Sequence, residues 1–247
     1  NQMSLTKYLL FKYLRFDKTQ PFIMLSALLA FLGVGVGLIV LIVAMAIMNG
    51  FDKEFERKLF TMNYPITILS AIRGNIDESD VSELKQKFPN LKFSPYIMSQ
   101  VIIKGANSFE GGLLFGVNSA DERQINSVVA AGLGDRELDG YGLLVGQGVK
   151  NEMMINENDK LTLIFTKNDP SGFALTPKMK RFDVVSSFSS GLVAYDKSYL
   201  YTSVEALRKI LEYDEGKFDG IHVFSNDPFA DIEKISRELR LGQKAIG

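Results

Sequence analysis

The residues of this 247-residue chain that could do chemistry are few and scattered. Cysteine is absent, which excludes disulfides, zinc–thiolate sites and a cysteine nucleophile. His222 is the single histidine, so no two-histidine metal motif can form. It lies in the strand-like segment 220–225, where we expect a core histidine bonded to a neighbour. The sequence therefore predicts no metal site built on histidine or cysteine.

The common catalytic motifs are missing as well. No G-x-x-x-x-G-K-[ST] pattern occurs, so the chain has no P-loop, and no G-x-S-x-G elbow occurs. The carboxylates are scattered over predicted helix faces, where solvation explains them. With a formal net charge of −1 there is no electrostatic case for nucleic acid. We therefore expect a non-catalytic chain without a cofactor of its own and without a nucleic-acid partner.

A single apolar stretch dominates the N-terminal part of the chain. Residues 22–48 contain 27 residues and no charge. A helix of that length reaches about 40 Å, whereas the hydrocarbon core of a bilayer is about 30 Å thick. A cleaved signal peptide is the alternative, and Ala44-Met45-Ala46 resembles a cleavage site. Because the run is about twice the usual apolar length of a signal peptide, the sequence favours a transmembrane helix at 21–50.

The flanking charges predict an orientation for this helix. Segment 1–20 carries four basic residues, Lys7, Lys12, Arg15 and Lys18, against one acid, whereas charges balance after the helix. The positive-inside rule then places segment 1–20 in the cytoplasm. We expect residues 51–247 in the periplasm of a bacterial cell, anchored to its inner membrane.

Small residues recur at a four-residue spacing within the apolar stretch. Gly33 and Gly37 form a G-x-x-x-G pattern, and Ala46 and Gly50 repeat the spacing. Small residues allow a second helix to approach closely in lipid. Glycine is also simply commoner in membrane helices, but a helix-packing face is the favoured interpretation.

The region after the apolar stretch alternates strands and helices, which predicts an α+β domain. Phe51, Phe55 and Leu59 give one apolar face to a stalk helix at 51–62, which Asn63-Tyr64-Pro65 ends. Predicted strands lie at 66–71, 95–105, 111–117, 160–165, 181–188, 199–203 and 220–225. Segment 141–154 predicts a strand, a glycine turn and a short helix. Predicted helices lie at 77–88, 120–131, 203–213, which Ser203 caps, and 228–240.

One loop, 166–181, differs from the others. Pro170 and Pro177 bracket an apolar tip, Phe173-Ala174-Leu175, and basic residues follow at once. An apolar tip beside cations suits a hydrophobic groove with an acidic rim on a partner. Taken alone, the residues leave open whether the tip docks on a partner or folds back on its own sheet.

Several segments resemble the permease subunits of the lipoprotein-releasing ABC transporter, the LolC/LolE/LolF type. They are "FKYLR", "MNGF", "LLVGQGV", "NDKLTLI", "GIHVFSNDP" and the most specific one, residues 180–211, which contains R-F-x-V-[VI]-x-x-F-x-S-G-x-x-x-Y-D. The resemblance covers essentially all of the chain. MacB efflux permeases and FtsX-type permeases are wider relatives.

The resemblance implies a fold and a domain organisation. It implies an α+β periplasmic domain with a porter-like α/β part, about 63–118 and 199–247, and an inserted β-rich part, about 119–198, behind one transmembrane helix. Family members continue into three more spans, so the chain is expected to be part of a longer permease.

The resemblance also implies a function with named partners. These are extraction of lipoproteins from the inner membrane and their transfer to a periplasmic carrier chaperone. The work is driven by ATP and Mg²⁺ on a separate cytoplasmic ATPase subunit, with a second permease copy or paralogue in the complex. Alternatives are a MacB-like exporter, an FtsX-like regulator of wall hydrolases or, in a different class, a single-span sensor.

The resemblance assigns the unusual loop to carrier binding. A hairpin hook would enter the carrier, and polar residues nearby would form a pad. The hook residues would be Pro170, Ser171, Gly172, Phe173, Ala174, Leu175, Thr176 and Pro177, and the pad residues Lys178, Lys180 and Arg181. Met179 departs from the pattern, because a polar residue is expected in the pad.

Overall fold

The computed structural model describes residues 21–70, 76–105, 108–165, 177–239 and 243–246, without the side chains of residues 21, 23, 24 and 53–61. The chain divides into two units, Asn1–Glu56 and Arg57–Gly247.

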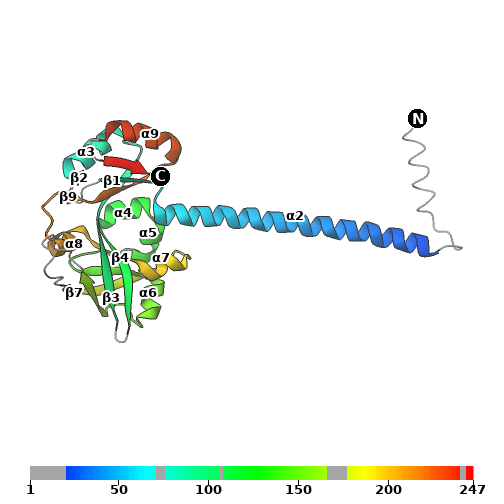
Figure 1. Ribbon diagram of the computed structural model, residues 1–247, viewed down its shortest axis with the longest axis horizontal. Helices are drawn as coiled ribbons and strands as arrows, with labels where there is room; N and C mark the ends of the chain where they lie inside the picture. Colours follow the sequence, from blue (N-terminus) through cyan, green and yellow to red (C-terminus); the bar gives the residue numbers. More distant parts are fainter. Residues whose placement is uncertain (1–20, 71–75, 106–107, 166–176, 240–242, 247) are drawn as a thin grey trace. The chain divides into compact units, whose positions relative to one another are not determined.

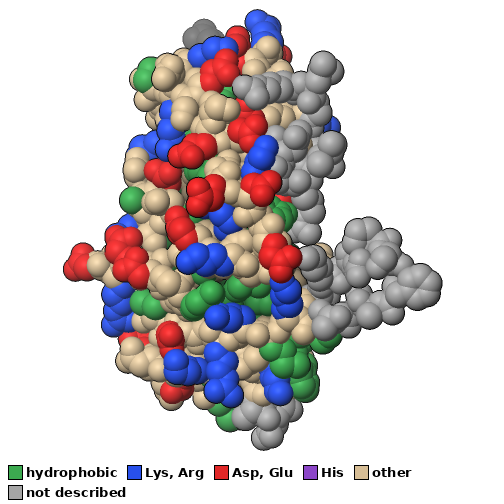
Figure 2. Space-filling model, turned by 90° about the vertical axis from the view of Figure 1, so that its left-hand side faces the viewer, with side chains coloured by type: hydrophobic (Ala, Val, Ile, Leu, Met, Phe, Trp, Pro, Cys, Tyr) green, Lys and Arg blue, Asp and Glu red, His purple; other side chains and the backbone are tan. Residues whose placement is uncertain are grey.

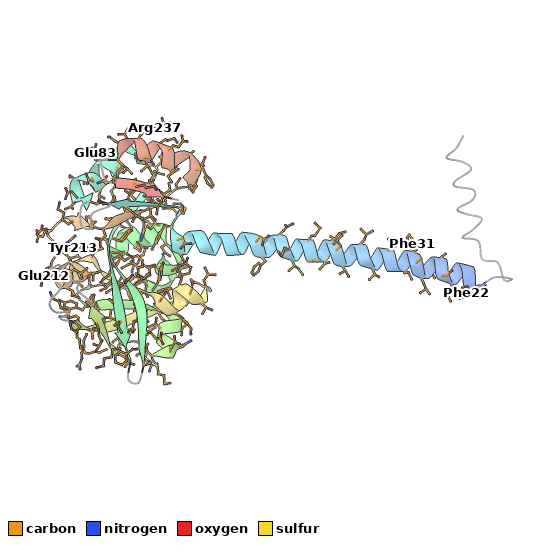
Figure 3. All side chains as sticks on the ribbon, viewed as in Figure 1. Phe22, Phe31, Glu83, Glu212, Tyr213 and Arg237 are labelled. Carbon is orange, nitrogen blue, oxygen red and sulfur yellow. The ribbon has the colours of Figure 1, made fainter. Side chains whose placement is uncertain are left out.

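The first described element is α2 (Pro21–Asn63), one continuous helix of 43 residues (Figure 1). At 1.5 Å per residue it is about 64 Å long. Its segment Leu25–Asp52 has a mean hydropathy of 2.9 and is long and apolar enough to cross a membrane. The side chains of Phe22 and Phe31 project outward from it (Figure 3). The predicted apolar helix is therefore confirmed, and it continues without a break through the predicted stalk at 51–62.

The helix ends where the sequence predicts. Tyr64 takes the left-handed backbone conformation, with a φ of 57°. Pro65 follows and has no amide hydrogen with which to continue a helix. The chain then enters its first strand.

Nine strands of the described residues form one mixed sheet, in the order β11-β1-β10-β3-β4-β8-β5-β7-β6. Pairing is antiparallel except between β4 and β8 and between β5 and β7. The strands are β1 (Ile66–Ser70), β3 (Lys92–Lys104), β4 (Phe109–Val117), β5 (Gly142–Gly146), β6 (Lys160–Phe165), β7 (Lys178–Phe188), β8 (Tyr199–Ser203), β10 (Gly220–Phe224) and β11 (Gln243–Ile246).

The sheet closes on itself over part of its width, because β6 also pairs with β3. The ring runs β3-β4-β8-β5-β7-β6 and back to β3. Residues 92–96 of β3 pair with β10, and residues 101–104 pair with β6, so β3 serves both the open and the closed part. The ring takes strands from both the porter-like and the inserted part, whose boundaries stay predictions.

The helices α3 (Glu78–Lys87) and α9 (Pro228–Glu238) lie beside the open part of the sheet (Figure 1). β2 (Ile76–Asp77), directly before α3, pairs with β9 (Lys217–Phe218) in a separate two-stranded sheet. Val81 and Leu84, three residues apart on α3, are buried. The predicted helices at 77–88 and 228–240 are thus confirmed to within two residues.

The single helix predicted at 120–131 is wrong, because two helices, α4 (Ser119–Ile125) and α5 (Ser127–Leu133), occupy this segment. Asn126 separates them. Its side chain accepts hydrogen bonds from the amides of Val128 and Val129, each at 3.1 Å, and so caps a new helix. A short polar side chain that competes for backbone amides explains the break.

Two short helices pack against each other beside β5 of the ring. α6 (Gln147–Glu152) packs against α7 (Val193–Ser198), which the sequence did not predict. A Cβ at Gly146 would lie 2.2 Å from the carbonyl oxygen of Asp196, so glycine is required for this approach. α8 (Val204–Leu211) packs on β4, and Ser203 caps it as predicted, through the amide of Ala206 at 3.1 Å.

The apolar interior has two clusters of buried residues. The larger one is built mainly from the strands together with α3, α8 and α9. The smaller one contains the last apolar residue of α2, and consists of Met62, Tyr96, Phe115, Val117, Val129, Leu133, Leu138, Leu144, Phe188 and Tyr201. The end of α2 is therefore built into the core of the second unit. The predicted α+β class is confirmed.

Candidate functional site

Strands β6 and β7 form the hairpin that carries the predicted docking loop. They pair in register from Lys160↔Asp183 to Phe165↔Lys178. The two chain ends of the loop are thus held side by side as neighbours in one ladder. Phe165 and Phe182 are buried on the inner side of this hairpin, so its base is fixed by the core.

The predicted hook residues are mostly beyond the described part of the chain. Residues 170–176, including Phe173 and Leu175, lie outside the described residues. Pro177 is described and exposed. The hook assignment therefore stays a prediction.

The three predicted pad cations do not share one face of β7. Lys178 and Lys180 alternate with Met179 and Arg181, and successive side chains of a strand point to opposite faces. Lys178 pairs with Glu212 and donates to the carbonyl oxygen of Ile210 at 3.4 Å.

The other two cations have different surroundings. The Lys180 ammonium lies 3.7 Å from the centre of the Tyr141 ring, a cation–π contact. Arg181 is exposed on the opposite face. Of the three, Lys178 and Lys180 are thus engaged within the chain, and Arg181 is directed to solvent.

An apolar row crosses the outer face beside the hairpin. Ile102 of β3 is registered with Ile164 of β6, which is registered with Met179 of β7. Met179 is 59% exposed and Ile102 is 37% exposed. Independently of this row, Figure 2 shows a band of hydrophobic side chains on one face of the molecule, with both basic and acidic side chains around it. Met179, which departs from the polar pattern expected of a pad, extends this apolar row.

A second cluster of functional interest lies where α2 ends. The Tyr64 hydroxyl donates to the Glu122 carboxylate, and Asn126 Nδ2 donates to the same hydroxyl at 3.0 Å. The Tyr201 hydroxyl lies 3.3 Å away. Since the Tyr64 proton goes to Glu122, Tyr201 is the donor in this contact. We call Tyr64, Ser94, Tyr96, Glu122, Asn126, Tyr201 and His222 the Tyr64 cluster.

The Glu122 carboxyl is completely buried in this cluster. Ser94 Oγ donates to its second oxygen at 2.7 Å. Burial raises the pKa of Glu122 to about 6, although hydrogen bonds from Tyr64 and Ser94 act in the opposite direction. Burial also raises the pKa of Tyr64 and Tyr201. The carboxylate is thus retained in the core by its hydrogen-bond donors.

His222 is a stacked core residue. Its ring lies between those of Tyr64 and Tyr96, with centroid distances of 3.5 and 4.0 Å. Burial lowers its pKa well below the ordinary value, so it is neutral at pH 7. Nδ1 has no hydrogen-bond partner among the described residues. The ring is held by stacking on both of its faces, and the predicted hydrogen bond to a neighbour stays a prediction for Nε2.

The predicted helix-packing residues are exposed on α2. A Cβ built at Gly33, Gly37 or Gly50 would meet no described atom within 4 Å, and Ala46 is exposed too. Packing within the described chain thus gives no reason for glycine at these positions. A helix-packing role for them stays a prediction.

Sequence reasoning missed the Tyr64 cluster. From the sequence, Asn63-Tyr64-Pro65 predicts only the end of a helix, and Glu122 a solvated helix carboxylate. No local signal in the sequence marks the cluster, because the left-handed conformation of Tyr64 is visible only in the structure. Among the described residues, no group of three metal-ligating side chains occurs.

A family model, the MacB-like periplasmic core domain, matches residues 27–240, which is most of the chain. The chain belongs to the MacB-like periplasmic core domain family. This membership agrees with the mixed α/β fold and the apolar helix that precedes it.

Curated relatives confirm the resemblance to lipoprotein-releasing permeases. The chain is 24% identical over 235 residues to the lipoprotein-releasing system transmembrane protein LolC of Neisseria meningitidis, with 91% of this chain and 55% of that protein covered. It is also 24% identical to LolE of Haemophilus influenzae, with 90% and 55% covered. The chain thus spans about half the length of these relatives.

A solved structure shows the same fold at low sequence identity. The extracellular domain of the ABC-type transporter YknZ from Gram-positive bacteria superposes with a TM-score of 0.50 and 9% identity. The match covers 74% of this chain and 99% of that one. It supports the fold alone.

Proposed function

We propose that this chain is part of a permease subunit of a bacterial inner-membrane ABC transporter. The transporter extracts lipoproteins from the inner membrane and passes them to a periplasmic carrier chaperone. The β6–β7 hairpin is the observation that carries the proposal, since its paired strands hold both ends of the loop at 166–177. The relatives named for lipoprotein release support the same assignment.

In this proposal the chain is not the enzyme of the complex. A separate cytoplasmic ATPase binds ATP and Mg²⁺ and supplies the work. A second permease copy or a paralogue completes the membrane part, and Gly33, Gly37, Ala46 and Gly50 pack against its helices. The span Leu25–Asp52 crosses the inner membrane with the N-terminus in the cytoplasm.

Docking of the carrier has two components. The apolar loop tip enters the carrier's lipid-binding groove, and burial of its phenylalanine and leucine supplies most of the free energy. The exposed Arg181 and the exposed apolar side chains of Ile102 and Met179 face the rim of the carrier. Lys178 and Lys180 stabilise the base of the hairpin and do not contact the carrier, because both already interact with other residues of this chain.

Reconstitution tests the proposal. The native transporter containing this chain is purified with its ATPase and placed in liposomes with a fluorescent lipoprotein. We expect release that requires both ATP and the periplasmic carrier in the outer solution. Release that proceeds equally without the carrier, or an absence of release with all components present, contradicts the proposed function.

A further inference from the structure

Three consecutive residues at the end of α2 are each fixed to a different part of the second unit. Met62 is buried in the smaller apolar cluster. The Asn63 side-chain oxygen accepts a hydrogen bond from the Tyr195 hydroxyl of α7. Tyr64 bonds to Glu122 of α4 and stacks on His222 of β10. The last turn of the helix is therefore held by apolar, polar and aromatic contacts at once.

These contacts differ in how strongly they oppose rotation of the end of α2. The hydrophobic effect that buries Met62 is non-directional. Hydrogen bonds to a buried carboxylate are directional and costly to leave unmade. Glu122 is fully buried, and Tyr64 and Ser94 both donate to it. The Tyr64 hydroxyl thus opposes rotation of the helix end more strongly than Met62 alone could.

The same cluster touches the strand that leads to the hairpin. The Tyr201 hydroxyl contacts Tyr64, and the Tyr201 ring meets the Phe188 ring edge to face at 5.7 Å. Phe188 is the last residue of β7, and Lys178, at the opposite end of that strand, borders the loop. At about 3.3 Å per residue, β7 carries this contact over roughly 33 Å. A continuous series of packed groups therefore joins the end of α2 to the hairpin.

We propose that Tyr64 is a positioning residue through which movement of α2 reaches the β6–β7 hairpin, by way of Tyr201 and Phe188. The inference rests on the proposed function, because it assigns the hairpin to carrier docking and the movement to the ATPase cycle. Coupling of this kind needs a packed element that both ends can bias. The cluster and β7 supply the continuous packed contacts that such coupling requires.

The experiment uses three variants of the native transporter in the reconstituted release assay. Tyr64→Phe keeps the ring that stacks on His222 and removes the hydroxyl. Glu122→Gln keeps an oxygen that accepts from that hydroxyl. Tyr213→Phe is the matched control, since the Tyr213 hydroxyl also donates to a carboxylate, Asp219, at 2.8 Å; Figure 3 labels Tyr213, just after α8.

For each variant we measure ATP hydrolysis, lipoprotein released per ATP, and the melting temperature. We expect Tyr64→Phe to hydrolyse ATP at the wild-type rate but to release roughly tenfold less per ATP, the size expected for one lost hydrogen bond to a charged group. Glu122→Gln retains most of the coupling, and Tyr213→Phe retains all of it.

The outcomes separate the inference from the proposed function. If wild type releases lipoprotein and Tyr64→Phe releases as much per ATP, Tyr64 is not a coupling residue and the inference is overturned. The same holds if Tyr64→Phe and Tyr213→Phe lose melting temperature and release in parallel, since that describes a structural role only. If wild type releases nothing, the proposed function itself fails, and the inference fails with it.

Discussion

The hairpin base and the Tyr64 cluster use polar residues in opposite ways. At the hairpin, charged side chains are partly exposed and pair across the surface, as Lys178 does with Glu212. In the cluster a carboxyl group is fully buried and held by hydroxyl donors. The exposed ion pair is weakened by water and salt, whereas the buried carboxyl group fixes internal geometry through directional hydrogen bonds.

The loop tip gives the largest expected effect on binding. Phe173→Ala with Leu175→Ala removes two side chains whose burial is worth roughly 1.5–3 kcal/mol each. We expect carrier affinity to fall by roughly a hundredfold or more, while the melting temperature stays close to wild type. Titration of the immobilised carrier and differential scanning fluorimetry measure the two quantities. A large fall in melting temperature shows instead that the tip belongs to the core.

Phe188, at the buried end of β7, tests whether the smaller apolar cluster holds this strand. It is 2% exposed and packs against Tyr201. Phe188→Ala leaves a cavity, and we expect a loss of about 3–5 kcal/mol in the free energy of unfolding. Urea denaturation of the second unit measures it. A loss below about 1 kcal/mol means that the smaller apolar cluster does not hold the end of β7 as described.

The pH dependence of stability isolates the two titrating groups of the Tyr64 cluster. The cluster's tyrosines have raised pKa values and stay neutral from pH 4 to 8. His222 has a lowered pKa, so below pH 6.5 the unfolded chain binds a proton that the folded chain does not, and stability is lost as pH falls. Glu122 has a raised pKa of about 6 against 4.5, so it acts in the opposite direction.

Variants separate these two contributions. Between pH 6.5 and 4.5, Glu122 offsets part of the acid loss by roughly 1–2 kcal/mol. Glu122→Gln should therefore lose stability more steeply than wild type on acidification, and His222→Phe less steeply. Melting temperatures at four pH values give the slopes. Parallel curves for the three proteins would show that neither group titrates as its burial requires.

Lys178 gives the smallest expected effect. Its ion pair with Glu212 joins side chains that are 41% and 59% exposed. Exposed pairs contribute below about 1 kcal/mol and weaken with salt. We expect Lys178→Ala to change the free energy of unfolding by less than that, measured in 0.1 and 1 M salt. A clearly larger loss means that the hairpin base depends on this pair.

Much of the fold could be predicted because its signals are local. The 27 uncharged residues predict the long apolar helix by length alone. Alternation predicts β6, and the serine before α8 predicts its cap. Local signals failed where tertiary contacts decide, as at α7, whose place depends on Gly146 lying against Asp196. Of the candidate site, the sequence located the hairpin but not which face each cation takes.

By itself the sequence determined that the chain has an apolar span, an α+β domain behind it and a bracketed apolar loop, because hydropathy, periodicity and turn residues act over a few neighbours. Only the tertiary structure decided that Tyr64, Glu122 and His222 meet, although they are separated by 58 and 100 residues or more along the chain. Their contact requires β10, α4 and the end of α2 to converge. That convergence depends on which strands pair across the sheet, and no local pattern in the chain specifies it.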